Sequence, residues 1–385
     1  MKLTKSLFLA FAGLGLFACS NEEIAENNQF PEGNGVVSVK IVTPETLTKA
    51  MPKEAPDATT TTGSVKVVGD ITIELDADEG GATYTLKKED IAGGATTVKF
   101  WNVKNPTKVR VYMNGAPDDG DYSAVSILDL QSAPANIAAY GEVVPSLTSA
   151  TESPAADNST VKNEGNEAED AGKKYQMYTA NVTMEIPVAR LEVSGIAHKK
   201  PTASGETCEY GTLTIDGIYL DNVKATGAGT FADYKFTGDQ AGSGADAILS
   251  YPILSTPEGN NNFMNFDKVW PESGKAYAFN FYPGESVTQN PVLKIYFAQA
   301  TGVDADHVKS SPRYAMITKY VASGTGVGGD ALTLQAGKVY CITNAILDDK
   351  NIIGDEGGNT YYGVTVEVTE ATWTVETIDG VWVEE

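Results

Sequence analysis

Few residues of this chain combine the types and the spacing that catalysis needs. Catalysis near neutral pH usually recruits histidine, and the 385 residues include two, His198 and His307, each next to a Lys or an Asp. The sequence has no GxSxG elbow, no HExxH motif and no paired CxxC, which are the minimum parts of many serine hydrolases and zinc sites. We therefore expect no catalytic residue, no metal and no cofactor, and a protein that is not an enzyme.

Two acidic runs carry the ligand type that calcium prefers. Asp76, Asp78 and Glu79 precede Gly80, and the second run covers residues 118–121. Carboxylate oxygens suit calcium, but neither run continues to a bidentate Glu at the spacing of a helix-loop-helix site. We interpret both runs as solvated acidic turns.

Aromatic side chains offer another chemistry, because they can stack on sugar rings. The chain has four tryptophans: Trp101, Trp270, Trp373 and Trp382. In β-sandwiches, large aromatic residues are more often core residues or strand-pair partners. We predict core positions for them, with sugar stacking as the alternative.

Cys19 has the sequence context of lipid attachment. It ends the stretch Leu16-Phe17-Ala18-Cys19, which resembles a bacterial lipobox. Lys2 and Lys5 form a basic start, and residues 7–17 are mainly apolar, so residues 1–18 have the layout of a secretory signal peptide. The lipobox implies cleavage before Cys19 and a lipid on its thiol. The alternative is an ordinary secretory signal with a cysteine near the cut by chance.

Composition limits the partners. The net charge is −23 without a Lys/Arg cluster, and phosphate backbones need a basic footprint, so we exclude nucleic acid. Downstream of residue 18 no run of roughly 18 apolar residues occurs, and we expect no membrane-spanning helix.

The other two cysteines, Cys208 and Cys341, would lie in a compartment outside the cytosol, where a disulfide can persist. Either they pair, or they are buried thiols in neighbouring strands.

The composition and the apolar pattern of the chain indicate strands and turns. The chain has 38 Gly, 17 Pro and 18 Tyr, and with many Val and Thr this composition suits short strands and tight turns. Residues 19–35 are mostly polar and are interpreted as a flexible tether. Val37, Val39 and Ile41 then alternate with mostly polar residues, which indicates a half-buried strand.

The stretch 43–63 follows this first strand and is polar again. It contains Lys49 and Lys53 among prolines and threonines. We interpret it as an exposed loop that a protease can cut.

Further strands are predicted from alternation or from short apolar runs. Their approximate ranges are 64–75, 97–103, 108–113, 175–184, 186–193, 213–220, 276–282, 291–298, 332–334 and 339–347. Residues 145–174 are so polar that we predict a long loop. Short strands with unequal loops favour a sandwich over a barrel, and the length exceeds what one core usually organises. We predict two tandem β-sandwich domains, at 36–185 and 186–385.

The last apolar segment changes phase within one strand. Two sets of alternating residues have opposite parity: Val364, Val366 and Val368, then Ala371, Trp373 and Val375. A slip of one residue swaps the buried face, so the chain must bulge, bend or change partner around Thr369 and Glu370. An apolar strand at a free end docks either in its own sheet or in that of another chain.

Together these features resemble the fimbrillins, the subunits of Bacteroidales type V pili. The matching stretches are PVARLEV at 187–193, LQAGKVYCI at 334–342, and 364–375 with its Ala-Thr-Trp core. Ser20-Asn21-Glu22-Glu23 also resembles the acidic signal that sends Bacteroidales lipoproteins to the outer face of the cell. The resemblance covers nearly the whole chain and implies an all-β fold of two transthyretin-like sandwiches.

The resemblance also implies a mechanism. Fimbrillins are exported as lipoproteins, and an arginine- or lysine-specific protease cuts after the first strand, so that a terminal strand of the next subunit fills the groove. Mapped onto this sequence, the displaced strand holds Val37, Val39 and Ile41, and the cut falls at Lys49 or Lys53. The donor strand holds Val364, Val366, Val368, Ala371, Trp373 and Val375. The loop contains Lys and no Arg, which leaves the protease open.

The implied partners are other pilus subunits, the processing protease and, before cleavage, outer-membrane lipid. The implied location is the cell surface, first as an outer-membrane lipoprotein precursor and then in the fimbrium, with a role in adhesion. The alternative is a monomeric glycan-binding lipoprotein of the outer surface. A glycan binder should keep its first strand and lipid, whereas a pilus subunit should shed both.

Overall fold

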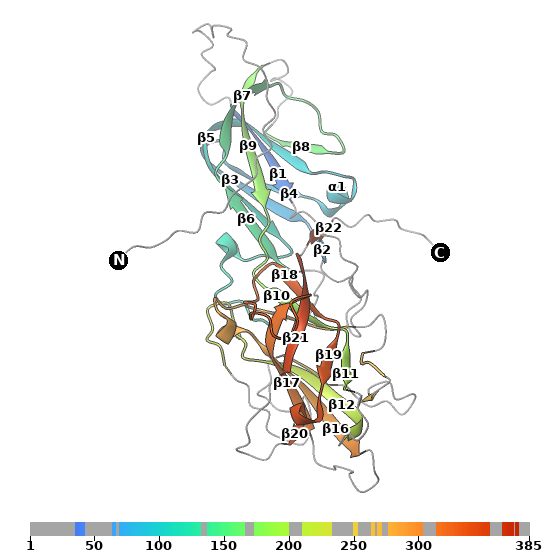
Figure 1. Ribbon diagram of the computed structural model, residues 1–385. Coiled ribbons are helices and arrows are strands. Elements are labelled where there is room, and N and C mark those ends of the chain that lie inside the picture. The colour runs from blue at the N-terminus through green and yellow to red at the C-terminus, as the bar shows by residue number, and fades with distance from the viewer. Residues whose placement is uncertain are drawn as a thin grey trace, which may run out of the picture.

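The structure is a computed structural model, and nearly all of its regular elements are strands. It describes residues 35–42, 64–66, 69–131, 137–165, 173–199, 210–232, 249–252, 263–265, 268–271, 276–302, 313–354, 364–372 and 374–376. Figure 1 shows two groups of strands that follow one another along the long axis of the molecule. The predicted all-β class is confirmed. Among the described residues, no helix has the length and apolar character to cross a membrane.

The first group contains eight strands, with the short helix α1 (Lys88–Ala92) and a 3-10 turn, η1 (Asp118–Gly120). The strands are β1 (Gly35–Val42), β3 (Ile71–Glu79), β4 (Ala82–Leu86), β5 (Thr97–Met113), β6 (Ala139–Val143), β7 (Ser146–Glu152), β8 (Val161–Glu164) and β9 (Tyr175–Thr183). Their order is β4-β3-β5-β1-β9-β7, and β6 and β8 also pair with β5.

The long strand β5 belongs to both layers of this group. Its first part pairs with β1 and β8, and its later part pairs with β3 and β6. Between the two parts, Asn102 and Asn105 have φ values of 58° and 46°, a left-handed conformation that asparagine tolerates better than most residues. The bend lets Phe100 and Val111 contribute to the same buried cluster. The sequence analysis predicted two strands here, and the structure has one bent strand.

Within its described residues, the second group contains twelve strands and two 3-10 turns, η4 (Val287–Gln289) and η6 (Asp349–Asn351). The strands are β10 (Ala189–Val193), β11 (Ile196–His198), β12 (Tyr210–Asp221), β13 (Leu249–Pro252), β14 (Phe263–Asn265), β15 (Tyr277–Phe281), β16 (Val292–Gly302), β17 (Arg313–Ala322), β18 (Lys338–Ile342), β19 (Ala345–Leu347), β20 (Ile353–Gly354) and β21 (Val364–Thr372). Ten form a sheet whose main path is β13-β12-β16-β17-β21-β18-β10-β15, while β11 pairs with β19.

Strand β21 changes partner midway. Val364 to Val368 run parallel to β17, and Thr369 to Thr372 run antiparallel to β18. The change falls at the position where the sequence pattern slips by one residue. Of the three predicted alternatives near Thr369, a bulge, a bend or a change of partner, the structure has the change of partner. Beyond it, β22 (Thr374–Glu376) pairs in parallel with β2 (Ser64–Lys66), between the two groups (Figure 1).

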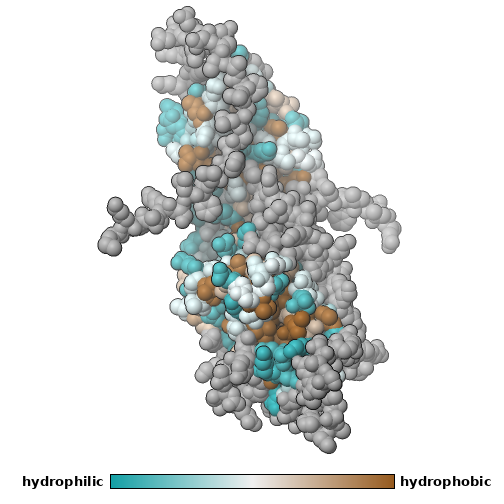
Figure 2. Space-filling model, viewed as in Figure 1, coloured by the Kyte–Doolittle hydropathy of each residue, from teal (hydrophilic) through white to brown (hydrophobic). Residues whose placement is uncertain are grey.

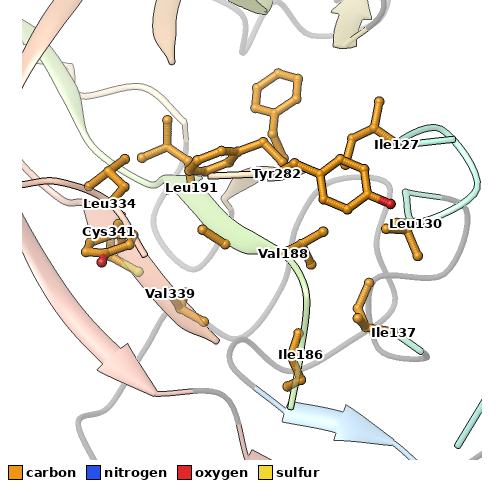
Figure 3. Packing of buried hydrophobic residues seen from close by; sticks show 14 of the residues in the cluster. Ile127, Leu130, Ile137, Ile186, Val188, Leu191, Tyr282, Leu334, Val339 and Cys341 are labelled. Atoms are coloured by element: carbon orange, nitrogen blue, oxygen red, sulfur yellow. The ribbon is translucent and has the colours of Figure 1, made fainter. Parts of the chain in front are cut away.

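The two groups meet through a turn that belongs to the first. Gln131 exchanges hydrogen bonds with the backbone of Asn280, and the Tyr282 hydroxyl donates to the carbonyl of Val125. Figure 3 shows Ile127 and Leu130 beside Tyr282. Their side chains belong to the same buried cluster as the cores of both groups, so the joint is packed. A division into two domains near residue 186 stays a prediction.

Other predicted elements also differ from the structure. The single strands predicted over 64–75 and 339–347 are each two strands, β2 and β3 in the first case and β18 and β19 in the second. The stretch 145–174 contains β7 and β8, so the prediction of one long loop was wrong. Most β7 residues are exposed, and its backbone pairing with β9 holds it in place without an apolar face. At 332–334 the structure has no strand, although Leu334 is buried.

The visible surface carries scattered apolar residues. Figure 2 shows apolar residues on the second group near β19, where Ile346 is 51% exposed. Single exposed apolar residues are normal in globular proteins, so the exposure of Ile346 does not indicate a functional site.

Candidate functional site

The candidate site is the position that β1 occupies. β1 lies between two strands, antiparallel to β5 and parallel to β9. Its register with β9 is unbroken from Gly35 opposite Gln176 to Val42 opposite Thr183. We call the space between β5 and β9 the β1 slot. A strand that leaves this slot leaves unpaired backbone on both sides.

The inner face of β1 is part of the main core. Val37 and Val39 are fully buried, and Ile41 packs against the same cluster while remaining partly exposed. These are the three residues predicted for the displaced strand, and the structure brings them onto one face. Whether the strand is displaced stays a prediction.

The outer face of β1 has an apolar contact that alternation alone did not predict. Val36 is fully buried and clusters with Trp101 and Tyr175, whose ring centroids are 5.2 Å apart in an edge-on arrangement. The Trp101 indole donates to Asn163 Oδ1 at 2.9 Å, and the Tyr175 hydroxyl donates to Asn102 Oδ1 at 3.0 Å. Both rings are therefore fixed around Val36.

The first residue of β1 is a glycine for steric reasons. A Cβ on Gly35 would lie 2.7 Å from the carbonyl oxygen of Val103 and 3.1 Å from the Tyr178 ring. Any strand that fills the slot in the same register needs glycine or a local bulge at this point.

The predicted donor residues are divided between two places. Val364, Val366 and Val368 are buried in the core of their own chain, in the part of β21 that pairs with β17. In the sequence pattern they looked the same as donor residues, because a strand alternates in the same way in either sheet. The backbone of Ala371 lies opposite Val339 of β18.

The later part of the segment pairs with another strand. Val375 is in β22, and its partner is Val65 of β2. Trp373 is outside the described residues. β2 directly follows the stretch 43–63, which contains Lys49 and Lys53.

The residues predicted for lipidation and for proteolysis, Cys19, Lys49 and Lys53, lie outside the described residues. Two other lysines can be compared with them. Lys99 lies in β5 and pairs with Glu152, and Lys294 lies in β16 and pairs with Asp221. Both belong to strands with neighbours on either side. Proteases need accessible backbone, which paired strands withhold.

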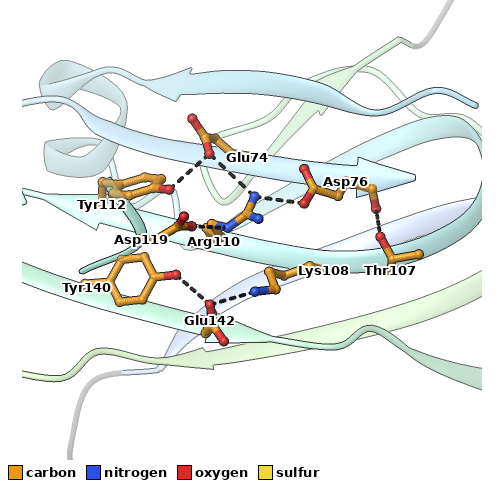
Figure 4. A network of polar contacts seen from close by, with 9 residues as sticks. All are labelled: Glu74, Asp76, Thr107, Lys108, Arg110, Tyr112, Asp119, Tyr140 and Glu142. Atoms are coloured by element: carbon orange, nitrogen blue, oxygen red, sulfur yellow. Dashed lines mark hydrogen bonds and ion pairs between the residues drawn. The ribbon is translucent and has the colours of Figure 1, made fainter. Parts of the chain in front are cut away.

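The acidic runs take part in ion pairs (Figure 4). Arg110 lies 2.8 Å from Asp76 and 2.8 Å from Asp119, and 3.8 Å from Glu74. The Tyr112 hydroxyl donates to Glu74 Oε2 at 3.1 Å, and burial raises the pKa of Tyr112 to about 12. Among the described residues, no group of three His, Cys, Asp or Glu side chains could hold a metal ion.

A buried charged pair lies on β10. Arg190 Nε donates to Glu192 Oε1 at 2.5 Å, and the Cys341 thiol donates to Glu192 Oε2 at 3.3 Å. Burial, and then the negative charge of Glu192, raise the pKa of Cys341, which favours an unreactive thiol. Cys208 lies outside the described residues, so its pairing with Cys341 stays a prediction.

His198 is held in a structural contact. Its Nε2 lies 2.9 Å from Asp349 Oδ1, which links β11 to η6. Burial lowers the pKa of His198, although the bond to Asp349 acts in the opposite direction. His307 is outside the described residues.

Two tryptophans occupy the core positions predicted for them. Trp101 and Trp270 are 3% and 2% exposed, and Trp270 stacks on Tyr277 with ring centroids 4.8 Å apart. The structure therefore does not offer either ring to a sugar. Trp373 and Trp382 lie outside the described residues.

Comparisons with known proteins give matches among solved structures alone. No protein-family model matches the chain, and none of the curated proteins matches it. A putative cell adhesion protein from Bacteroides eggerthii is similar in structure with 16% identity and a TM-score of 0.46, over 91% of this chain and 99% of that chain.

Two further similar structures come from Porphyromonas gingivalis. One is a fimbrilin with 12% identity and a TM-score of 0.49, over 89% of this chain and 99% of that chain. The other is a tip fimbrial protein with a C-terminal truncation, with 11% identity and a TM-score of 0.38, over 88% of this chain and 100% of that chain.

Proposed function

We propose that this protein is a structural subunit of a surface pilus, not an enzyme, and that it polymerises by donating a strand to the next subunit. The observation that carries the proposal is the position of β1. The first described strand of the chain fills the middle of a sheet, between β5 and β9. A cut in the loop 43–63 would separate it covalently from β2 and everything that follows.

The slot that β1 leaves would demand a replacement. Val36, Val37 and Val39 are each fully buried, and burying such a side chain contributes roughly 1.5–3 kcal/mol, so the three contribute about 5–9 kcal/mol. The unpaired backbone edges of β5 and β9 add to the cost. A strand from another subunit restores both contributions, which is strand addition between chains.

The donor, in this proposal, is the C-terminal segment from Ala371 onward. Val364, Val366 and Val368 anchor the segment in its own subunit. Ala371, Trp373 and Val375 then take the inner positions of Val37, Val39 and Ile41 in the neighbour. For this, the segment must give up two pairings within its own chain. Its residues from Ala371 onward must separate from β18, and β22 must separate from β2, with which it pairs through three residues.

Such a contact joins different surfaces of the two subunits. A head-to-tail contact that does not close on itself produces a filament. Lipid on Cys19 would hold the uncut precursor in the outer membrane, and a protease that cuts at Lys49 or Lys53 would release it. We place the mature subunit in a fimbrium that serves adhesion.

The test is polymerisation of the purified protein after limited digestion with a lysine-specific protease. We expect ladders of oligomers on unheated gels, and filaments by electron microscopy. A variant that ends at Thr372 lacks the donor residues Trp373 and Val375, so it should form no ladders. It should unfold at nearly the same urea concentration as the intact monomer, because among the described residues it loses only the three-residue pairing of β22 with β2. If the truncated variant still forms ladders of oligomers, strand donation by this tail is refuted. A cleaved, intact protein that never forms ladders would favour the monomeric glycan binder.

A further inference from the structure

A pocket of about 450 Å³ opens at the joint between the two strand groups. We call it the joint pocket. Tyr122 comes from the first group, while Pro187, Lys224, Tyr282 and Pro283 come from the chain that follows it. Two aromatic rings and two prolines give it a mainly apolar lining, and Lys224 supplies a positive charge. Pockets with this composition suit an aromatic side chain with an acidic group close by.

The walls of the joint pocket are fixed by backbone contacts. Ala228 N donates to the carbonyl of Ser123 at 3.0 Å, and Ile127 N donates to the carbonyl of Ala225 at 2.8 Å. A Cβ on Gly227 would lie 2.4 Å from the carbonyl oxygen of Tyr122, so the close approach depends on glycine. The pocket is therefore formed before any occupant arrives.

Two polar groups of the lining lack an ion-pair or hydrogen-bond partner among the described residues. The Nζ of Lys224 lies 4.8 Å from the centre of the Phe231 ring, and no carboxylate of the described residues forms an ion pair with it. The hydroxyl of Tyr122 is buried and has no hydrogen-bond partner among the described residues.

The joint pocket lies beyond one end of the β1 slot. Val42, the last residue of β1, pairs with Thr183 of β9, and Pro187 of the pocket follows four residues later. Four extended residues span at most about 14 Å. A strand that fills the slot in the direction of β1, and continues past it, therefore comes within reach of the pocket.

The C-terminal end of this chain has the matching length and chemistry. Nine residues follow Glu376, enough for about 30 Å of extended chain. They end in Gly380-Val381-Trp382-Val383-Glu384-Glu385, which places one large aromatic residue two positions before a pair of carboxylates. On a chain with a net charge of −23, a site for such an acidic end needs a local cation, and Lys224 provides one.

We propose that the joint pocket receives the C-terminal end of a second copy of this chain. Trp382 of the neighbour lies against Tyr122, Tyr282 and the prolines, and Glu384 or Glu385 pairs with Lys224. The inference rests on the proposed strand donation and adds a second contact to it, beyond the slot. The contact fixes the register of the donor strand, because a shift by two residues would withdraw Trp382 from the pocket.

A disulfide trap tests the contact directly. Ala228 lines the pocket, so the full-length variant Ala228→Cys with Val383→Cys should form covalent oligomers after cleavage, assembly and mild oxidation. Each single variant controls for Cys19, Cys208 and Cys341 and should give none on non-reducing denaturing gels. A crosslink within one monomer, found by peptide mapping, would show that the tail occupies its own pocket and would overturn the proposal.

A charge exchange tests the ion pair. We expect Lys224→Glu to lower the fraction of assembled protein about 2- to 5-fold, the range of a partly exposed pair. Combining it with Glu384→Lys and Glu385→Lys should restore assembly. Lys174→Glu, the same charge change in an exposed residue before β9, is the matched control and should have no effect.

The outcomes separate the two proposals. Ladders that form without crosslinks, and that respond to Lys224→Glu no more than to Lys174→Glu, overturn the pocket contact and leave strand donation standing. The absence of ladders from the cleaved wild-type protein overturns both.

Discussion

Val39 should contribute to the stability of the uncut precursor and not to the stability of the assembled polymer. Its side chain is fully buried in the core, between Val98 of β5 and Ala180 of β9. Val39→Ala removes two buried methyl groups at about 0.8 kcal/mol each and leaves a cavity, so the precursor should lose about 2–3 kcal/mol of unfolding free energy. If β1 is removed before assembly, the polymer no longer contains residue 39, so the substitution should not change the stability of the polymer.

Val366→Ala is the matched control, because Val366 is 2% exposed and lies in the part of β21 that pairs with β17, which in the proposal stays in its own subunit. Urea unfolding of the uncut proteins should show similar losses for both variants. Urea dissociation of purified polymers should then show a lower midpoint for Val366→Ala and the wild-type midpoint for Val39→Ala. Equal losses in the polymer for both variants would mean that β1 remains in the assembled subunit, which would refute the reasoning.

Three further outcomes follow from the same scheme. Cys19→Ser should abolish incorporation of radiolabelled palmitate and delivery to the surface; labelled mutant protein would show that the lipobox was misread. Trypsin should cut the folded precursor at Lys49 or Lys53 well before Lys99, as peptide mapping over time can show, and equal rates would remove the case for an exposed loop. Trp373→Ala should lower the temperature at which polymers dissociate while the unfolding free energy of the uncut monomer stays unchanged; the reverse result would place that ring in its own core.

The sequence pattern located those strands in which one face is buried. In β1 the alternation of Val37, Val39 and Ile41 identified the inner face correctly, because the intervening Ser38 and Lys40 are polar and partly or fully exposed. In β21 the slip near Thr369 located the change of partner, because a one-residue shift has only a few structural solutions. These features are local, so a single sequence is sufficient to find them.

Features that depend on distant parts of the chain were missed. Residues 146–152 lack an apolar face, and β7 exists because β9 offers it backbone partners. In β10 all five residues are buried, including Arg190 and Glu192, which satisfy each other. The contact of Val36 with Trp101 and Tyr175 joins segments far apart in sequence, and alternation would assign Val36 to solvent.

Only part of the candidate site was predicted, because the pairing of its strands also depends on distant parts of the chain. The sequence identified both β1 and the terminal segment as apolar strands, and it could not decide to which sheet Val364, Val366 and Val368 belong. A strand of alternating valines satisfies its own core or that of a neighbour equally well. The structure divides the segment at Thr369, and this division suggests which part stays and which part is donated.

The most direct test is the identity of the first residue in the subunits of assembled filaments. N-terminal sequencing and intact-mass measurement of filaments sheared from the cell surface should find a chain that begins at Ala50 or Glu54, directly after Lys49 or Lys53, without Gly35–Val42 and without lipid. Filaments whose subunits still begin at a lipidated Cys19 and retain β1 would contradict strand replacement.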